Sequence, residues 1–423
     1  MKICLVATFP PSGRQLNEYA YYIARELQAN PEVELTILAD ELTCYDFATD
    51  QDGKPLKIDQ QPELPGFNVI RCWKFGSLST PVRLLQAIRR LKPDVVWYNL
   101  VFSSFATPEK PFAAFAGLSA PALTRAAGFY THITLHHIIE HVDFSATGVR
   151  LERLFRIGSN LTTRALLGAN SVAVLLSKYH QTLRTKYSAH NVLLSTHGTF
   201  SSAATPPDFT KRGNPEKRIL AIGHWGTYKR LETLMEAFPL VLEKIPTARL
   251  IVGGANHHTK VGYWESIRDA QPPGLPVEFR GYIPEEQIPE LFASASIVAI
   301  PYDSATGSSG PAHQACEFGV PIVCADIPDF RAMVDDEEMA VRFYKPGNAV
   351  DLAEQLIAIL QSPTLECEMA KQNFVAGLDM MIGNVVNNYL RWFRLQRCKE
   401  GLYKSGEISK RWLQGAMPDG EAV

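Results

Sequence analysis

The chain has 423 residues, of which 46% are hydrophobic and 20% charged, and its formal net charge is -2. This composition is typical of a globular protein of about two domains, and the balanced charge argues against a nucleic acid as a main partner. The seven cysteines are scattered without a C-x-x-C pair, which indicates reduced thiols in the cytoplasm and excludes a disulfide frame or a cysteine zinc site.

The first half of the sequence alternates predicted strands with helices. Residues 2–8 (KICLVAT) predict a strand, and Pro10 and Pro11 end this apolar run too early for a signal peptide. Residues 15–28 predict a helix whose apolar face carries Leu16, Ala20, Ile23, Ala24 and Leu27. Further strands are expected at residues 33–39, 67–71, 94–99, 130–137, 171–175 and 191–195. This order predicts a parallel, doubly wound sheet.

The alternation breaks at residues 199–218, whose proline, serine and charge predict a linker. Strands are expected again at 218–223, 248–254, 276–281, 296–301, 321–326 and 340–344, and residues 379–398 predict one long helix. We therefore expect an α/β fold of two Rossmann-like, doubly wound parallel-sheet domains facing a cleft, residues 1–199 and 218–378. Residues 379–423 would form a crossover helix, which packs back toward the first domain, and a tail. No stretch approaches the roughly 18 uncharged apolar residues of a membrane span.

Residues 301–323 (PYDSATGSSGPAHQACEFGVPIV) place four small residues between a predicted strand and a short helix. Pro311 suits the first helical position, and Gly319 followed by Pro321 predicts the helix stop. Backbone N–H groups at such a helix start, free of large side chains, predict a phosphate site. The alternative is a flexible turn.

Residues 221–238 (AIGHWGTYKRLETLMEAF) predict a strand, a tight loop and a helix that begins at Lys229 and Arg230. Cations at a helix N-terminus oppose its dipole unless an anion shares the site. The pair therefore indicates an anion site, and the alternative is a solvated surface turn.

The order and spacing of these motifs resemble glycosyltransferase family 4. The resemblance covers about residues 218–360 and rests on G-x5-K-x4-L-x2-A in 223–237, LIVGG, EFRGYIPEEQIPELFASASIVAIP, GSSG and ACEFGVPIVCADIPDF, in that order. It implies a retaining, sugar-nucleotide-dependent enzyme of the two-domain GT-B fold, with the first domain on the acceptor side and the second binding the nucleotide sugar.

The resemblance also implies which residues bind the donor. The family's diphosphate-binding Arg and Lys fall on His224 and Lys229, and Arg230 is expected to supply the fixed charge that His224 lacks. The family's Glu-x7-Glu pair, which contacts sugar and ribose, falls on Thr306 and Gln314, with Glu317 as the competing ribose ligand. The remaining expected donor-binding residues are Tyr282, Gly307, Ser308, Ser309 and Gly310.

Two further site residues are expected in the first domain. Gly13 follows the first strand, where the family has a glycine turn near the donor, although an ordinary loop is the alternative. His136 matches the family's cleft histidine and, with Lys229, is expected to be catalytic; His137 is a weaker candidate. A metal site is the alternative for the cluster of His132, His136, His137 and His141, but the strand predicted there disfavours it. The acidic segment 334–338 (VDDEE) is expected to be a solvated turn rather than a metal site.

Between Gly148 and Tyr187 the sequence has many basic residues and Glu152 as its one acid. The basic residues are Arg150, Arg153, Arg156, Arg164, Lys178, Arg184 and Lys186. With the apolar residues 112–129, this region predicts peripheral contact with an anionic membrane; a solvated basic helix over core residues is the alternative.

The sequence thus predicts a cytoplasmic glycosyltransferase, with peripheral contact at the inner face of the membrane as a further hypothesis. It would move a sugar from a nucleoside diphosphate sugar to a glycan or lipid-linked acceptor with retention, without a metal or other cofactor. Two alternatives stay open: a sugar-nucleotide 2-epimerase on the same frame, and a degenerate nucleotide-binding protein without transfer activity.

Overall fold

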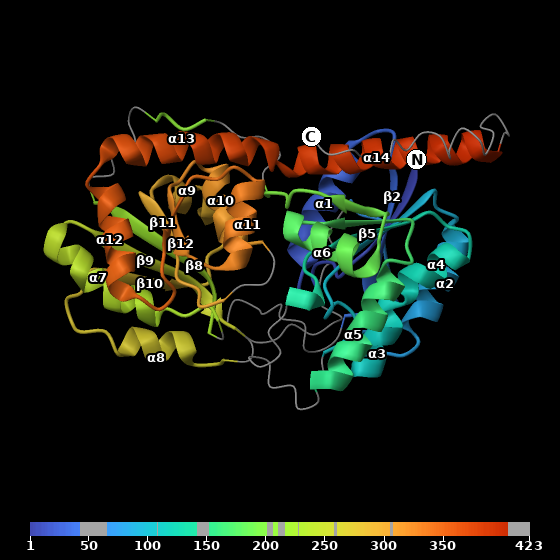
Figure 1. Ribbon diagram of the computed structural model, residues 1–423, viewed down its shortest axis with the longest axis horizontal. Coiled ribbons are helices and arrows are strands. Elements are labelled where there is room, and N and C mark those ends of the chain that lie inside the picture. The colour runs from blue at the N-terminus through green and yellow to red at the C-terminus, as the bar shows by residue number, and fades with distance from the viewer. Residues whose placement is uncertain are drawn as a thin grey trace.

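The structure is a computed structural model, and it describes residues 1–42, 66–107, 109–141, 152–200, 206–209, 216–226, 228–257, 260–304 and 308–404. Two α/β units lie side by side, and the last helix of the chain returns to the first of them (Figure 1). The predicted fold class is confirmed.

The first sheet has seven parallel strands in the order β3-β2-β1-β4-β5-β6-β7. The strands are β1 (Lys2–Val6), β2 (Glu34–Asp40), β3 (Val69–Trp73), β4 (Val95–Leu100), β5 (Thr131–Leu135), β6 (Ser171–Val174) and β7 (Val192–Leu194). Their helices are α1 (Asn17–Ala29), α2 (Thr80–Leu91), α3 (Pro111–Leu118), α4 (Ala120–Ala126), α5 (Glu152–Leu166) and α6 (Ser177–Tyr187), with a short 3₁₀ turn at Ile139–His141. Each strand overlaps one that the apolar runs predict.

The second sheet has six parallel strands in the order β10-β9-β8-β11-β12-β13. The strands are β8 (Arg218–Trp225), β9 (Arg249–Asn256), β10 (Val277–Gly281), β11 (Ile297–Ile300), β12 (Ile322–Ala325) and β13 (Val341–Tyr344). The helices are α7 (Glu232–Lys244), α8 (Tyr263–Asp269), α9 (Ile288–Ala293), α10 (Gly310–Glu317), α11 (Pro328–Asp336) and α12 (Ala349–Leu360), with a 3₁₀ turn at Glu285–Gln287.

Both sheets reverse their strand order once, between β1 and β4 in the first and between β8 and β11 in the second. At such a switch point the two connections leave the sheet on opposite faces and open a crevice at the carboxyl ends of the strands. Ligands of doubly wound proteins bind there, so the loops after β1, β4, β8 and β11 are where a site is expected.

The end of the chain forms two helices, α13 (Pro363–Asp379) and α14 (Ile382–Lys404), where the sequence predicts one helix from residue 379. They follow one another along the same side of the molecule (Figure 1), α13 on the second unit and α14 on the first. Tyr389 and Phe393 of α14 pack on Trp97, with ring centres 4.7 and 5.4 Å away. Residue 379 is therefore the last residue of α13, and Met380 and Met381 form the break between the two helices.

We predict that Phe393→Ala lowers the free energy of unfolding by about 3–5 kcal/mol, because it removes a buried ring from the contact between α14 and the first sheet. Val375→Ala on α13, where Val375 is 62% exposed, is the control and should change stability by less than about 0.5 kcal/mol. Urea unfolding followed by tryptophan fluorescence measures both. Equal stability of the two variants would contradict a stabilising role of α14.

Candidate functional site

The carboxyl edges of the two sheets face each other. Tyr179, in the helix after β6, donates a hydrogen bond from its hydroxyl to Asp329 Oδ2 at 2.6 Å, and Lys178 pairs with the same carboxylate. The Ser177 N–H, at the start of α6, donates to Asp336 Oδ2 at 2.7 Å. Asp329 and Asp336 lie on α11, after β12. Lys178, expected among the basic surface residues, is therefore engaged between the domains.

Lys229 is fixed by its backbone at the end of β8. Gly226 and Lys229 exchange N–H to carbonyl hydrogen bonds of 2.9 and 3.1 Å around a tight turn, in which Gly226 has φ of 107°. Lys229 is also bridged in antiparallel fashion to Tyr302, which follows β11. Helix α7 begins at Glu232. The sequence predicted that the helix begins at Lys229 and Arg230. In the structure both residues precede it.

The Lys229 ammonium is half-buried and lies 5.0 Å from the centre of the Tyr302 ring. Burial lowers the pKa of Lys229, and Tyr228 opposes this shift. No carboxylate forms an ion pair with it in the described part of the chain. By contrast, Arg230 is exposed and pairs with Glu232 at 3.4 Å and Asp303 at 3.3 Å. Of the two cations, Lys229 is therefore the one whose charge is left for an anion.

Glycines let the strand ends approach this lysine closely. A Cβ on Gly254, whose φ is 106°, would lie 1.8 Å from the Gly223 carbonyl oxygen. On Gly223 a Cβ would meet Tyr302 Oη at 3.6 Å and Lys229 Cδ at 3.9 Å. The close pairing of β8 and β9 at this point depends on having no side chain at Gly254.

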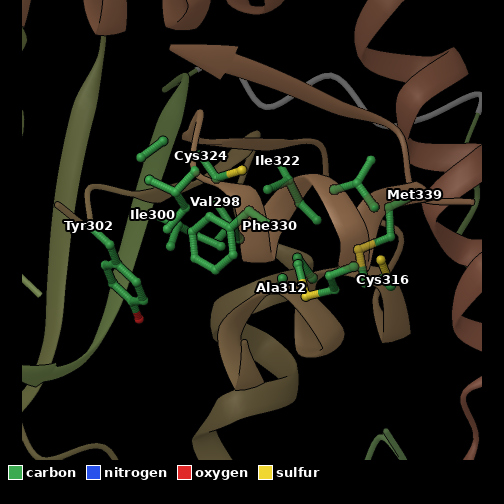
Figure 2. Close-up of a cluster of buried hydrophobic side chains, with 14 of the residues drawn as sticks. Val298, Ile300, Tyr302, Ala312, Cys316, Ile322, Cys324, Phe330 and Met339 are labelled. Atoms are coloured by element: carbon green, nitrogen blue, oxygen red, sulfur yellow. The ribbon is translucent and has the colours of Figure 1, made fainter. Parts of the chain in front are cut away.

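The small-residue loop ends beside Tyr302. Ser309 is buried, has extended backbone, and precedes α10, which begins at Gly310; Pro311 is therefore the second helical residue. The hydroxyls of Ser309 and Tyr302 are both buried without a hydrogen bond of normal geometry. They are nevertheless close: burial raises the pKa of Tyr302, and the Ser309 hydroxyl opposes that shift. Figure 2 shows Tyr302 at the edge of the apolar cluster, its hydroxyl turned away from Phe330 and Ala312.

Helix α10 offers an open N-terminus. A Cβ on Gly310 would meet nothing within 4 Å, and Ser308 is half-buried. Among the described residues, the N-terminus of α10, the Lys229 ammonium without a carboxylate partner and the buried hydroxyls of Tyr302 and Ser309 thus lie together, a set that suits a phosphate group. Thr306 and Gly307 lie outside the described residues.

The two candidate ribose ligands lie further along α10. Gln314 is half-buried, whereas Glu317 is buried at the last position of the helix, about 10 Å along the axis from Gly310. Gly319 has φ of 59° and ends the helix, as predicted, with the Val320 N–H bonded to the Ala315 carbonyl.

His136 lies directly after β5 and is buried. Its Nε2 is 2.8 Å from Asn99 Oδ1, and its ring makes an edge contact with Tyr19 at 4.8 Å. Burial, with a smaller contribution from His137, lowers the pKa of His136 to about 3. With Asn99 Oδ1 as acceptor, Nε2 of the neutral ring carries the proton and Nδ1 keeps its lone pair. The residue can therefore accept a hydrogen bond but does not supply a proton at neutral pH.

The neighbouring histidines are dispersed. His132 is buried in β5 between Ser171, whose Oγ is 2.7 Å from Nδ1, and the rings of Tyr389 and Phe393. His137 packs at 5.8 Å on Phe102. No group of three or more metal-ligating side chains forms among the described residues. The strand explains why His132 and His136 do not meet, because four residues of extended backbone separate them by about 13 Å.

Three other predicted residues are spread around the same edges. Gly13 is exposed in the loop after β1, His224 is exposed near the end of β8, and Tyr282 is 76% exposed just after β10. All three lie in loops or strand ends on the carboxyl side of their sheets, and their roles remain predictions.

A buried carboxylate that the sequence did not single out holds the Gly13 loop. Asp40 is fully buried and accepts hydrogen bonds from Ser12 Oγ at 2.6 Å and the Phe9 N–H at 3.2 Å. Arg71 completes the network by donating to the Pro10 carbonyl at 2.8 Å. Asp40 is the last residue of the apolar strand β2, and its place at the carboxyl end of a strand was the sequence signal for a functional carboxylate.

A polar hollow of 870 Å³ lies at the opposite, amino ends of β8 to β10. It is lined by residues that include Arg218, Arg249, Glu278 and Arg280. Two of these arginines are already paired with neighbouring glutamates, Arg218 with Glu216 and Arg280 with Glu278. This hollow is separate from the groups around Lys229.

Known proteins resemble the chain in its second half and in its whole fold. Residues 216–362 match the family described as "Glycosyl transferases group 1". Sulfoquinovosyl transferase SQD2 of Arabidopsis thaliana is 23% identical over 300 residues, 67% of this chain and 53% of that protein. The match thus spans about half the length of this curated relative.

Solved structures share the whole architecture. Sucrose-phosphate synthase from Thermosynechococcus elongatus has a TM-score of 0.69 at 15% identity, over 94% of this chain and 100% of that chain. Anabaena HepE in complex with UDP-glucose has a TM-score of 0.62 at 16% identity, over 93% of this chain and 99% of that one. The chain therefore has the two-domain GT-B fold of these structures. Residues 216–362, within its second unit, are the part that matches the group 1 glycosyl transferase family. Among the described helices, none combines the length and apolar character that crossing a membrane requires.

We predict that His136 stays neutral from pH 8 down to pH 5, because burial lowers its pKa to about 3. Replacing Asn99 by Asp would place a carboxylate beside Nε2, and should raise the pKa of His136 into the measured range. Ring signals from ¹⁵N-labelled histidine, assigned with His136→Gln, report both. Protonation of His136 above pH 5 in the unaltered protein would contradict the burial argument.

Proposed function

We propose that the protein is a glycosyltransferase that moves a sugar from a nucleoside diphosphate sugar to a glycan or lipid-linked acceptor, with retention of configuration. The observation that carries the proposal is the half-buried Lys229 without a carboxylate partner among the described residues, beside two hydroxyls that lack partners. A diphosphate supplies the missing charge and the missing acceptors. Retention comes from the resemblance to family 4.

The donor diphosphate would lie between Lys229 and the N-terminus of α10. Lys229 supplies a positive charge, Tyr302 and Ser309 supply O–H donors, and Gly310 leaves room for backbone contact. As the sugar–phosphate bond breaks, negative charge builds on the leaving diphosphate, and these fixed donors stabilise it most at that moment. In this proposal no metal is required, since the ammonium and the helix terminus take its role.

The transferred sugar would lie toward His136, which is held by Asn99 on the facing sheet edge. Its Nδ1 accepts a hydrogen bond from a sugar hydroxyl and orients the ring without proton transfer. The carboxyl edges of the two sheets are already linked through Tyr179 and Asp329, so both halves of the site face one space. HepE, which shares this fold, has been solved with UDP-glucose, and this likeness supports a nucleotide sugar as donor.

Lys229→Ala should weaken nucleoside diphosphate binding tenfold to a hundredfold and leave nucleoside binding nearly unchanged, because a charged hydrogen bond contributes roughly 1.5–3 kcal/mol. Calorimetric titration with UDP, GDP and ADP and with the three nucleosides identifies the base and measures the loss. Lys244→Ala, at the exposed end of α7, is the control.

Equal losses for diphosphate and nucleoside would reject the role of Lys229.

In a second experiment, the matching nucleotide sugars are incubated with the protein. Slow release of free sugar is expected from the unaltered chain and not from Lys229→Ala. Tight binding with no release of sugar would contradict transferase activity and favour a binding protein. Conversion of the bound sugar to its 2-epimer would favour the epimerase.

An apolar surface on the first unit supports a lipid-linked acceptor. Phe112 and Phe115 on α3 and Ile157 and Leu161 on α5 are exposed, Phe112 by 81%, and the two helices contact each other. We call these four residues the α3–α5 patch. Exposed phenylalanines beside a segment rich in arginine and lysine fit the headgroup region of an anionic bilayer.

Replacing Phe112 and Phe115 together by Ser should reduce co-sedimentation with phosphatidylglycerol vesicles at least threefold, because it removes both exposed aromatic rings from the α3–α5 patch. Val350→Ser with Val375→Ser, exposed on α12 and α13, is the matched control and should bind as the unaltered protein does. Equal binding of both double variants, or no preference for anionic over phosphatidylcholine vesicles, would reject the membrane contact.

A further inference from the structure

A buried histidine lies directly behind the small-residue loop. His313 is 1% exposed on α10, with Nδ1 2.7 Å from the Ser309 carbonyl oxygen and Nε2 2.8 Å from Glu337 Oε2. Glu337 comes from the acidic segment that the sequence predicts to be solvated, and it is 9% exposed. That expectation is wrong for Glu337, which is buried against His313. The sequence did not reveal this contact, because His313 lies 24 residues earlier in the chain.

The two contacts determine where the ring protons are. A carbonyl oxygen only accepts, so Nδ1 must carry a proton to bond with Ser309. The Glu337 carboxylate also accepts, so the contact with Nε2 needs a second proton between them. His313 and Glu337 therefore form a protonated pair, in which the ring donates in both directions.

The Ser309 carbonyl connects this pair to the loop. It accepts from the His313 N–H at 3.1 Å as well as from the ring, so its direction is fixed along α10. In a trans peptide the N–H of the next residue points the opposite way. The Gly310 N–H is thus directed out of the helix N-terminus. Ser309, whose hydroxyl is close to that of Tyr302, directly precedes this end of α10.

We propose that His313, held by Glu337, is a positioning residue for the donor diphosphate: it fixes the Ser309–Gly310 peptide so that its N–H meets the phosphate. This inference rests on the proposed function. The ring charge behind the loop also adds to that of Lys229, at a site where His224 is exposed and Arg230 is engaged by carboxylates.

The charged surroundings set the direction of the pH dependence. Burial lowers the pKa of His313, whereas Glu337 and the Ser309 carbonyl raise it. The two upward effects together outweigh burial, so the pKa of His313 is raised. The other titratable groups around the pair are His197, whose ring stacks on His313 at 4.7 Å, and then Tyr19, His136 and Cys316. Burial lowers the pKa of both His197 and His136, so neither competes for the proton.

A group whose pKa is raised on folding stabilises the fold below its unfolded value, and the contribution is lost as the pH rises through the folded pKa. Once His313 has lost its second proton, Nε2 presents a lone pair to the Glu337 carboxylate. The two groups then repel each other, and the ring holds the Ser309 carbonyl less firmly. Diphosphate affinity should therefore fall on the alkaline side of the raised pKa, while nucleoside affinity should not.

Two substitutions separate the two contacts of the ring. His313→Asn places an amide near the position of Nδ1 and keeps the bond to Ser309, whereas His313→Gln places it near Nε2 and keeps the bond to Glu337. We expect the Asn variant to bind the preferred nucleoside diphosphate within threefold of the unaltered protein at pH 7, and the Gln variant to lose about tenfold. Neither variant should show the fall in diphosphate affinity at alkaline pH that is expected of the unaltered protein.

Three results would overturn the inference: equal diphosphate affinities of the Asn and Gln variants, a fall in nucleoside affinity that matches the diphosphate, or a neutral His313 ring in ¹⁵N spectra at pH 7. If the unaltered protein binds no nucleoside diphosphate at all, the proposed function itself fails. The three results above would instead reject the role of His313 and leave the proposed function standing. Should His313→Gln not fold, Glu337→Gln serves instead and should move the loss of affinity to lower pH. An unmoved pH profile would contradict the role of Glu337.

Discussion

The central constraint of this protein is an ammonium group that the fold holds half-buried, with no carboxylate paired to it in the part of the chain that the structure describes. Lys229 is placed by its backbone, through the turn with Gly226 and the bridge to Tyr302, so it has little freedom to reach a surface carboxylate. Nearby, Arg230 takes the partners Glu232 and Asp303. Burying part of a charge without a partner is unfavourable, and an anionic ligand at this point removes the penalty.

Several features that look separate follow from this constraint. Gly223 and Gly254 have no side chains because the ends of β8 and β9 must approach each other beside Lys229 and Tyr302. The residues at the start of α10, Ser308, Ser309 and Gly310, are small and leave the helix N-terminus uncovered by large side chains of their own. The switch point between β8 and β11 brings the lysine and the loop together, although some eighty residues separate them in sequence.

The sequence predicted the fold well because its signals are local. Runs such as Ile297–Ile300 and Ile322–Ala325 are continuous and apolar, as buried parallel strands require. Gly319 ends α10 for a reason visible in the sequence, a left-handed backbone that glycine adopts freely. Lys229 and the loop through Ser309 and Gly310 could be named as candidates on the same basis.

What the sequence could not reveal depends on pairing between distant segments. Glu337 looks like one acid in a solvated turn until His313 is found against it, and Arg230 looks like a free cation until Asp303 is found beside it. Asp40 gave no motif, yet it organises the loop that carries Gly13. In each case the role of a charge is set by its tertiary partner, and one sequence contains no information on that partner.

The most direct measurement is a crystal structure of the protein with the nucleoside diphosphate that it binds best. A phosphate oxygen is expected within hydrogen-bond distance, about 3 Å, of Lys229 Nζ, and another within reach of a backbone N–H among residues 308–310. A diphosphate lying more than about 5 Å from both, beyond any hydrogen bond, would contradict the central claim. So would a diphosphate in the polar hollow beside Arg218 and Arg249.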